Sequence, residues 1–84
     1  MPERGTVVVP SCGRDEGMVM AVVKAEENAV WLANGKQRPL SRPKRKNIRH
    51  ITFTGQQINE SSMATDRELR RVLRALSTAI TEGG

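Results

Sequence analysis

The hydrophobic pattern divides the chain into a β-rich part, up to residue 55, and a helical segment towards its C-terminal end. In the first part, short β-branched and apolar runs alternate with turns rich in glycine, proline and asparagine, which is typical of short strands. Because hairpin-connected strands leave exposed edges unless the sheet closes, we expect a small five-stranded barrel. The strands are predicted at residues 5–10, 18–25, 29–33, 36–40 and 46–54.

The second predicted strand, residues 18–25, is apolar on both faces for most of its length. A strand of this kind is either central in its sheet or covered on its outer side by another element. We expect Met18, Met20 and Val22 to form its outer face, and the C-terminal helix to cover them.

Asn34-Gly35 is the strongest hairpin signal in the chain, because both residues tolerate the positive φ angles that a two-residue turn requires. The chain would then return as a short strand over residues 36–40. Pro39 restricts this strand to an edge of the sheet, since proline has no N–H to donate to a central ladder.

Residues 64–82 are predicted to form one amphipathic helix, which follows a polar linker at residues 56–63. Thr65 and Glu68 match the capping box that begins many helices. The hydrophobic side chains of the helix form one stripe, which we expect to pack on the barrel of residues 1–55. The stripe consists of Leu69, Val72, Leu73, Leu76 and Ile80.

Two expectations depend on this stripe. Met63 or Ala64, just before the helix, would pack against Leu69 as a hydrophobic staple. If the stripe covers the barrel, the chain is a monomer, which we favour. If the stripe stays uncovered, two copies would pair through the helix as a homodimer.

The chain has 14 Lys and Arg residues against nine Asp and Glu residues, a net charge of +5. Half of the positive charge falls in residues 36–50, which contain no acidic residue. A basic surface favours a polyanionic partner, because cations that neutralise phosphates release the counterions around a nucleic acid. The residues expected to contact phosphates are Lys36, Arg38, Arg42, Lys44, Arg45, Lys46 and Arg49.

Further candidates lie outside this basic run. Arg14 lies in a turn with two glycines. If Val30 and Leu32 point into the barrel, Trp31 points outwards and would stack on a base; the alternative is that Trp31 packs under the C-terminal helix. The helix face opposite the stripe is either a secondary basic face for the same ligand or a solvated surface. It carries Arg67, Arg70, Arg71 and Arg74.

No arrangement typical of catalysis, metal binding or cofactor binding is found, so we expect a protein that is not an enzyme and needs no metal or cofactor. His50 and Cys12 are the only residues of their kinds, which excludes a histidine- or cysteine-rich metal site and an internal disulfide. The single cysteine fits a cytoplasmic protein. No run approaches the roughly 18 apolar residues of a membrane helix, and no signal-peptide pattern opens the chain.

Several stretches between residues 5 and 51 follow one another in a characteristic order. They are Gly5 to Val8, Gly13 to Gly17, the alternation from Val19 to Val23, Val30-Trp31-Leu32 before Asn34-Gly35, Arg38-Pro39-Leu40, and Pro43 to Asn47. In this order they resemble a KOW-motif domain, and the chain is similar to bacterial KOW-domain RNA-binding proteins. Those proteins in turn resemble the KOW-bearing large-subunit ribosomal proteins of archaea and eukaryotes.

The resemblance implies an SH3-like five-stranded barrel that contacts RNA through its loops and its basic segment. A basic residue often follows the motif glycine that Gly17 matches; here Met18 follows it, which leaves Arg14 as the cation of the first loop. The implied function is non-catalytic RNA binding in translation, with rRNA or the ribosome as partner and no membrane. An SH3-like protein-interaction module and a polymerase-associated KOW accessory factor are the alternatives.

Overall fold

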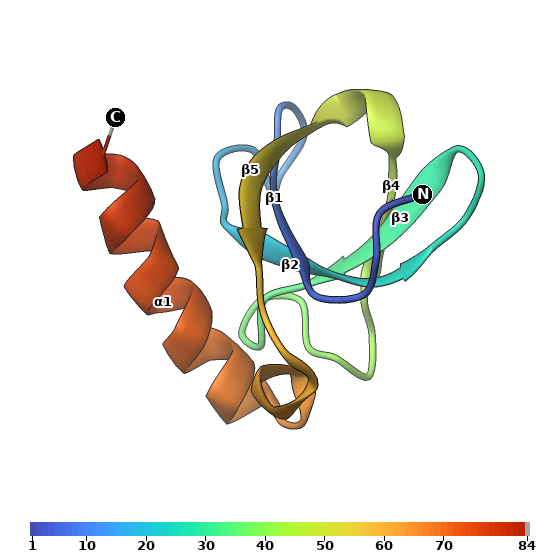
Figure 1. Cartoon of the computed structure of the whole chain (residues 1–84). Helices are drawn as coiled ribbons and strands as arrows, with labels where there is room; N and C mark the ends of the chain where they lie inside the picture. Colours follow the sequence, from blue (N-terminus) through green and yellow to red (C-terminus); the bar gives the residue numbers. More distant parts are fainter. Residues whose placement is uncertain (84) are drawn as a thin grey trace.

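The computed structural model describes the backbone of residues 1–83 and the side chains of residues 1–78. Five antiparallel strands form one sheet, and an α-helix follows them (Figure 1). The predicted mainly β fold with a C-terminal helix is therefore confirmed. The strands are β1 (Thr6–Pro10), β2 (Met20–Ala25), β3 (Ala29–Ala33), β4 (Lys44–Asn47) and β5 (Ile51–Gln57). The helix is α1 (Asp66–Gly83), and two 3-10 turns are η1 (Ile48–His50) and η2 (Glu60–Met63).

The strand order is β4-β3-β2-β1-β5, so the two edge strands, β4 and β5, are consecutive in the chain. The sheet curls into an open ring, and η1 spans the gap between its two edges (Figure 1). No strand pairing joins β4 to β5 within residues 1–83. The prediction of a barrel closed on itself is therefore wrong at the level of strand pairing.

The turn η1 separates the two edge strands along the chain. The Ile48 N–H donates a hydrogen bond to the Asn28 carbonyl (3.0 Å). The Arg49 N–H donates to the side-chain oxygen of Asn47 (2.8 Å). Because these donors are already used, the predicted continuous strand over residues 46–54 is broken into β4 and β5.

The sheet is covered by hydrophobic side chains on both faces, and the fold has two cores. The core inside the curl is formed by Val8, Met20, Val22, Val30, Leu32 and Ile51. The core on the outer face consists of Val7, Ala21, Ala33, Ile58, Met63, Leu69 and Leu73. The central strands are therefore buried on both sides, which is why their sequences show no clear alternation.

The prediction that the helix covers Met18, Met20 and Val22 is wrong. Met20 and Val22 are buried inside the curl, and Met18 packs against the same core. The helix covers the other face of β2, where Ala21 lies opposite Ala33 in the next strand. Small side chains at these two positions let the helix approach the sheet closely. Hydrophobicity alone does not determine the covered face of a strand that is apolar on both.

The start of α1 agrees with the predicted N-cap. The Thr65 hydroxyl accepts a hydrogen bond from the Glu68 N–H (3.1 Å), which satisfies one of the free donors of the first turn. Of the two staple candidates, Met63 is buried in the same core as Leu69, whereas Ala64 is exposed. Met63 therefore fixes the entry of the chain into the helix.

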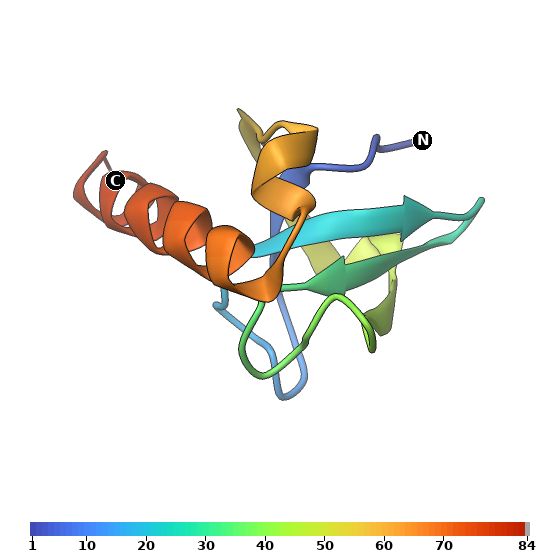
Figure 2. The ribbon, with the colours of Figure 1, turned by 90° about the horizontal axis from the view of Figure 1, so that it is seen from below.

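The helix packs on the sheet along its N-terminal half, and its C-terminal half extends beyond the sheet (Figure 2). Ile80, the last member of the predicted stripe, lies outside the described side chains. The segment predicted as a linker, residues 56–63, contains the end of β5 and η2, and it buries Ile58 in the outer core. Within the described part of the chain, no helix combines the length and hydrophobicity needed to cross a membrane.

The predicted edge strand at residues 36–40 is wrong, because residues 34–43 form a loop. The side-chain oxygen of Asn34 accepts hydrogen bonds from the N–H groups of Lys36 and Arg38, both at 3.0 Å. The Asn34 N–H in turn donates to the Arg38 carbonyl (2.9 Å). A side chain that captures backbone donors in this way competes with strand pairing, so the chain folds back on itself.

This loop is docked against the first turn of α1. Gly35 has a φ of +79°, and a Cβ at this position would collide with the Asp66 carbonyl oxygen. The Asp66 carboxylate accepts a hydrogen bond from the Leu40 N–H (2.7 Å). The Arg70 guanidinium donates to the Gly35 carbonyl (3.1 Å). These contacts bring Lys36 of the loop next to the arginines of the helix.

Candidate nucleic-acid interface

The seven cations of residues 36–50 are distributed over three elements. The loop carries Lys36, Arg38 and Arg42, the strand β4 carries Lys44, Arg45 and Lys46, and the turn η1 carries Arg49. Their local contacts differ, and these contacts determine which cations are available to a ligand.

Two of the seven cations are partnered inside the fold. The Arg38 Nε donates to both carboxylate oxygens of Asp15 (3.2 Å each), and the Asp15 side chain is only 5% exposed. The Lys46 Nζ donates to the Cys12 carbonyl (2.9 Å) and is partly buried. The first contact ties the turn that precedes β2 to the loop of residues 34–43, and the second ties it to the edge strand β4. They argue against Arg38 and Lys46 as phosphate ligands.

The alternation of side chains separates the cations of β4. Lys44 and Lys46 lie opposite Leu32 and Val30, whose side chains point into the inner core. Arg45 lies opposite Trp31, on the outer face. Because successive side chains of a strand point to opposite faces, the basic run of β4 does not form one continuous patch.

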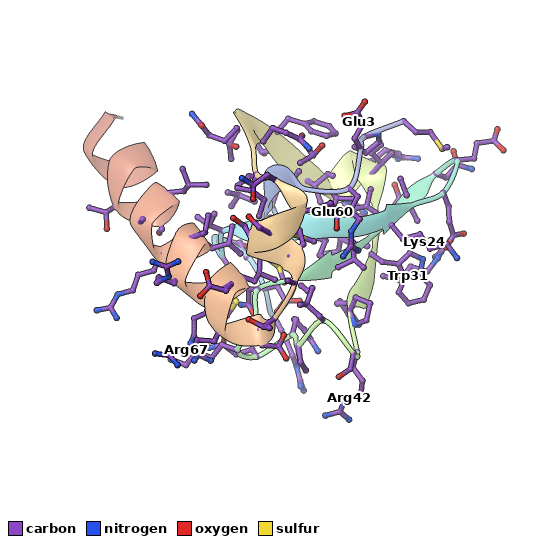
Figure 3. All side chains as sticks on the ribbon, turned by 60° about the horizontal axis from the view of Figure 1, so that its bottom comes forward. Glu3, Lys24, Trp31, Arg42, Glu60 and Arg67 are labelled. Carbon is purple, nitrogen blue, oxygen red and sulfur yellow. The ribbon has the colours of Figure 1, made fainter. Side chains whose placement is uncertain are left out.

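Trp31 lies between two cations on the outer face of the sheet. Lys24 of β2 is its register partner on one side, and Arg45 of β4 is its partner on the other. Trp31 and Lys24 lie side by side, on the far side of the molecule from Arg67 of α1 (Figure 3). Trp31 is partly exposed and is not in the outer core. The predicted outward direction is confirmed, and the alternative position under the helix is wrong.

Glu26 holds the indole ring of Trp31. Its carboxylate accepts a hydrogen bond from the indole N–H (2.5 Å) and lies 3.6 Å from the Arg45 Nε. The Trp31 hydrogen bond is the largest effect on the pKa of Glu26 and outweighs the opposing effect of desolvation. Together with the smaller effects of the Arg45 and Lys24 charges, it keeps this pKa below its ordinary value of 4.5. Glu26 is therefore ionised at neutral pH. Its pair with Arg45 is exposed, so it leaves Arg45 free to exchange partners.

The remaining predicted cations are exposed. Arg14, Arg42, Lys44 and Arg49 form no side-chain hydrogen bond or ion pair with any of residues 1–78. Of the helix arginines, Arg70 donates to the Gly35 carbonyl and Arg71 pairs with Glu68 (2.6 Å). We call Lys24, Trp31, Arg42, Arg45 and Arg49 the strand surface; Lys44 is not a member, because it lies on the other face of β4.

The sequence did not point to Lys24 as a member of this surface. In a regular strand, Lys24 would share a face with Met20 and Val22, inside the curl. The register of β2 against β3 shifts between Val22 and Lys24, and this bulge turns Lys24 outwards, opposite Trp31. Glu26 was missed because its contact with Trp31 depends on the same hairpin. No local signal in the sequence marks either contact.

The comparisons with known proteins do not identify a relative. No protein-family model matches the chain, and no curated protein matches it at a significant level. The KOW resemblance therefore stays a prediction.

Proposed function

We propose that the protein is a non-catalytic RNA-binding protein that contacts RNA through the strand surface. The observation that carries this proposal is the row of Lys24, Trp31 and Arg45 across three neighbouring strands. An aromatic ring offers a base a stacking surface, and the cations on both sides attract the phosphates that flank that base. Arg42 precedes the edge strand β4 and Arg49 follows it, so they add positive charge at its two ends.

The chemistry of this row favours RNA with unpaired nucleotides. Trp31 is the only tryptophan of the chain, so one base rather than a run of bases is stacked. A base inside a duplex is not accessible to an aromatic side chain, whereas a base in a loop or bulge is. The partner proposed here is therefore a folded RNA with an exposed loop, contacted mainly through phosphates.

We propose further that the fold is an SH3-like KOW domain. The curled antiparallel sheet supports this assignment, as does Gly17, which adopts a φ of +81° where the motif has its nearly obligatory glycine. On this proposal the RNA is rRNA, free or in the ribosome, and the protein acts in translation in the cytoplasm.

Substitution of Trp31 by alanine tests the proposal. We expect Trp31→Ala to weaken binding of a fluorescently labelled RNA hairpin by about 1–3 kcal/mol, the usual contribution of one stacked base. Phe53→Ala is the matched control, because Phe53 is 49% exposed but lies on β5, outside the strand surface. Fluorescence anisotropy measures both affinities, and thermal unfolding checks that both variants are folded.

Two results would contradict the proposal. One is equal RNA affinity of the Trp31→Ala and Phe53→Ala variants. The other is a protein partner that the chain captures from a nuclease-treated lysate, with an affinity that does not depend on salt. That result would indicate a protein-interaction module. Co-sedimentation with ribosomal subunits rather than with RNA polymerase would separate the ribosomal assignment from a polymerase-associated one.

A further inference from the structure

A second basic site lies on the opposite side of the molecule from Trp31. It is a groove of about 690 Å³ between α1, the turn that precedes β2 and the loop of residues 34–43. Arg67, at the start of this groove, and Trp31 lie far apart in Figure 3. The groove is lined by Gly17, Met18, Val19, Asn34, Lys36, Gln37, Arg67, Arg70, Arg71, Leu73, Arg74 and Ser77.

The charge of this lining is uniformly positive. One lysine and four arginines contribute to it, and no acidic side chain does. Three of these cations, Lys36, Arg67 and Arg74, have no side-chain partner among residues 1–78. Like charges three and four positions apart on a helix repel one another. An anionic ligand would relieve this repulsion, and arginine suits phosphate because its planar fork donates two parallel hydrogen bonds.

The rest of the lining suits a base. Met18, Val19 and Leu73 give the groove an apolar floor. Gln37 is part of the lining, and its side-chain oxygen accepts a hydrogen bond from the Asn34 amide (3.0 Å). The amide N–H groups of Gln37 donate to no partner among the described residues and are available to a base. The groove has the volume of ordinary small-ligand sites, in which an apolar surface is combined with a few polar groups.

We infer that this groove holds one unpaired nucleotide of the bound RNA, with its phosphate on the arginines and its base on the apolar floor. The inference rests on the proposed function. The molecule measures only 29 × 28 × 22 Å between Cα extremes, so a single folded RNA reaches both the groove and the strand surface. An acidic peptide would also satisfy the arginines, but it would leave the apolar floor and the Gln37 amide unused.

The first experiment probes the groove alone, with AMP and inorganic phosphate as separate ligands. Methyl-labelled full-length protein is titrated with each and followed by NMR. We expect AMP to shift the methyl signals of Met18 and Leu73, and inorganic phosphate to leave them unchanged. The AMP shifts should disappear in the Arg67→Gln, Arg74→Gln double variant and persist in Trp31→Ala. Equal shifts with both ligands, or stronger competition by a polyglutamate peptide than by RNA, would overturn the inference.

The second experiment measures RNA affinity against salt concentration. Loss of the one phosphate held by the arginines should lower the log–log salt slope of the double variant by about 0.7, the usual value per phosphate of single-stranded RNA. The Arg67→Lys, Arg74→Lys variant keeps the charge and should keep most of the slope. An unchanged salt slope in the double variant, together with weakened RNA binding by Trp31→Ala, would contradict RNA binding by the groove. It would leave the proposed RNA binding by the strand surface unaffected. Wild-type protein that binds AMP but no RNA would overturn the proposed function and the RNA part of this inference together.

Discussion

Among single residues, Glu26 has the most unusual position. A carboxylate beside cations that are proposed to bind phosphate would oppose an anionic ligand, yet the same carboxylate accepts a hydrogen bond from the only tryptophan of the chain. We interpret Glu26 as a positioning residue that holds the indole ring in place. Because its partners are exposed, the energy involved is small and is sensitive to pH and salt.

The pKa of Glu26 gives this interpretation a pH dependence. A carboxyl group whose pKa is lower in the folded than in the unfolded state stabilises the fold above the unfolded value, here about 4.5, and this contribution is lost as pH falls through the lowered folded-state value. We expect wild-type protein to lose more of its free energy of unfolding in this acidic range than Glu26→Gln, which has no carboxyl group to protonate. Urea denaturation at neutral and at acidic pH measures the difference. An acid sensitivity identical in the two proteins would contradict the role of Glu26.

Among the elements, the contact between the loop of residues 34–43 and α1 determines where the groove lies. Two glycines with similar backbone conformations allow this contact to be tested. Gly35 has a φ of +79° and is pressed against the Asp66 carbonyl. Gly17 has a φ of +81°, and a Cβ there would meet no atom within 4 Å.

We expect Gly17→Ala to cost about 1–2 kcal/mol of stability, because an alanine is strained in the left-handed region. Gly35→Ala carries the same strain and a collision with the helix backbone, so its cost should be larger by about 1–3 kcal/mol, the usual cost of overpacking. Chemical denaturation of both variants measures this difference. Equal costs at the two positions would show that the loop is not docked on α1.

Elements that depend on local signals were predicted correctly. The strand over residues 29–33, the N-cap at Thr65 and the helix that follows it agree with the structure. Elements that depend on competition between local and distant contacts were predicted wrongly. Residues 36–40 do not form the predicted edge strand, because the Asn34 side chain binds two of the backbone N–H groups that a strand would use. The face of β2 under the helix was predicted wrongly, because both faces of this strand are apolar.

At the scale of the whole molecule, the sequence shows which residues carry positive charge, but it does not show which of them have a partner inside the protein. Arg38 is partnered by Asp15, 23 positions away, and Lys46 by the Cys12 carbonyl, 34 positions away. Partners so distant in the chain are set by the tertiary fold and leave no trace in local composition. From the sequence, Lys36 and the helix arginines were assigned to two different surfaces. Docking of the loop on α1 places them in one groove.

If the strand surface binds RNA as proposed, the affinity should depend strongly on salt, because most members of the surface are cations and their number sets the counterions released from RNA. The salt dependence of RNA affinity in the Lys24→Gln, Arg42→Gln, Arg45→Gln triple variant tests this requirement. Arg4→Gln is the control, since Arg4 is also exposed but its guanidinium is already bonded to Glu60 and to the Val23 carbonyl. We expect the log–log salt slope to fall by about 2 in the triple variant, at roughly 0.7 per lost contact, and to stay unchanged in the control. A triple variant with the wild-type slope and affinity would contradict RNA binding by this surface.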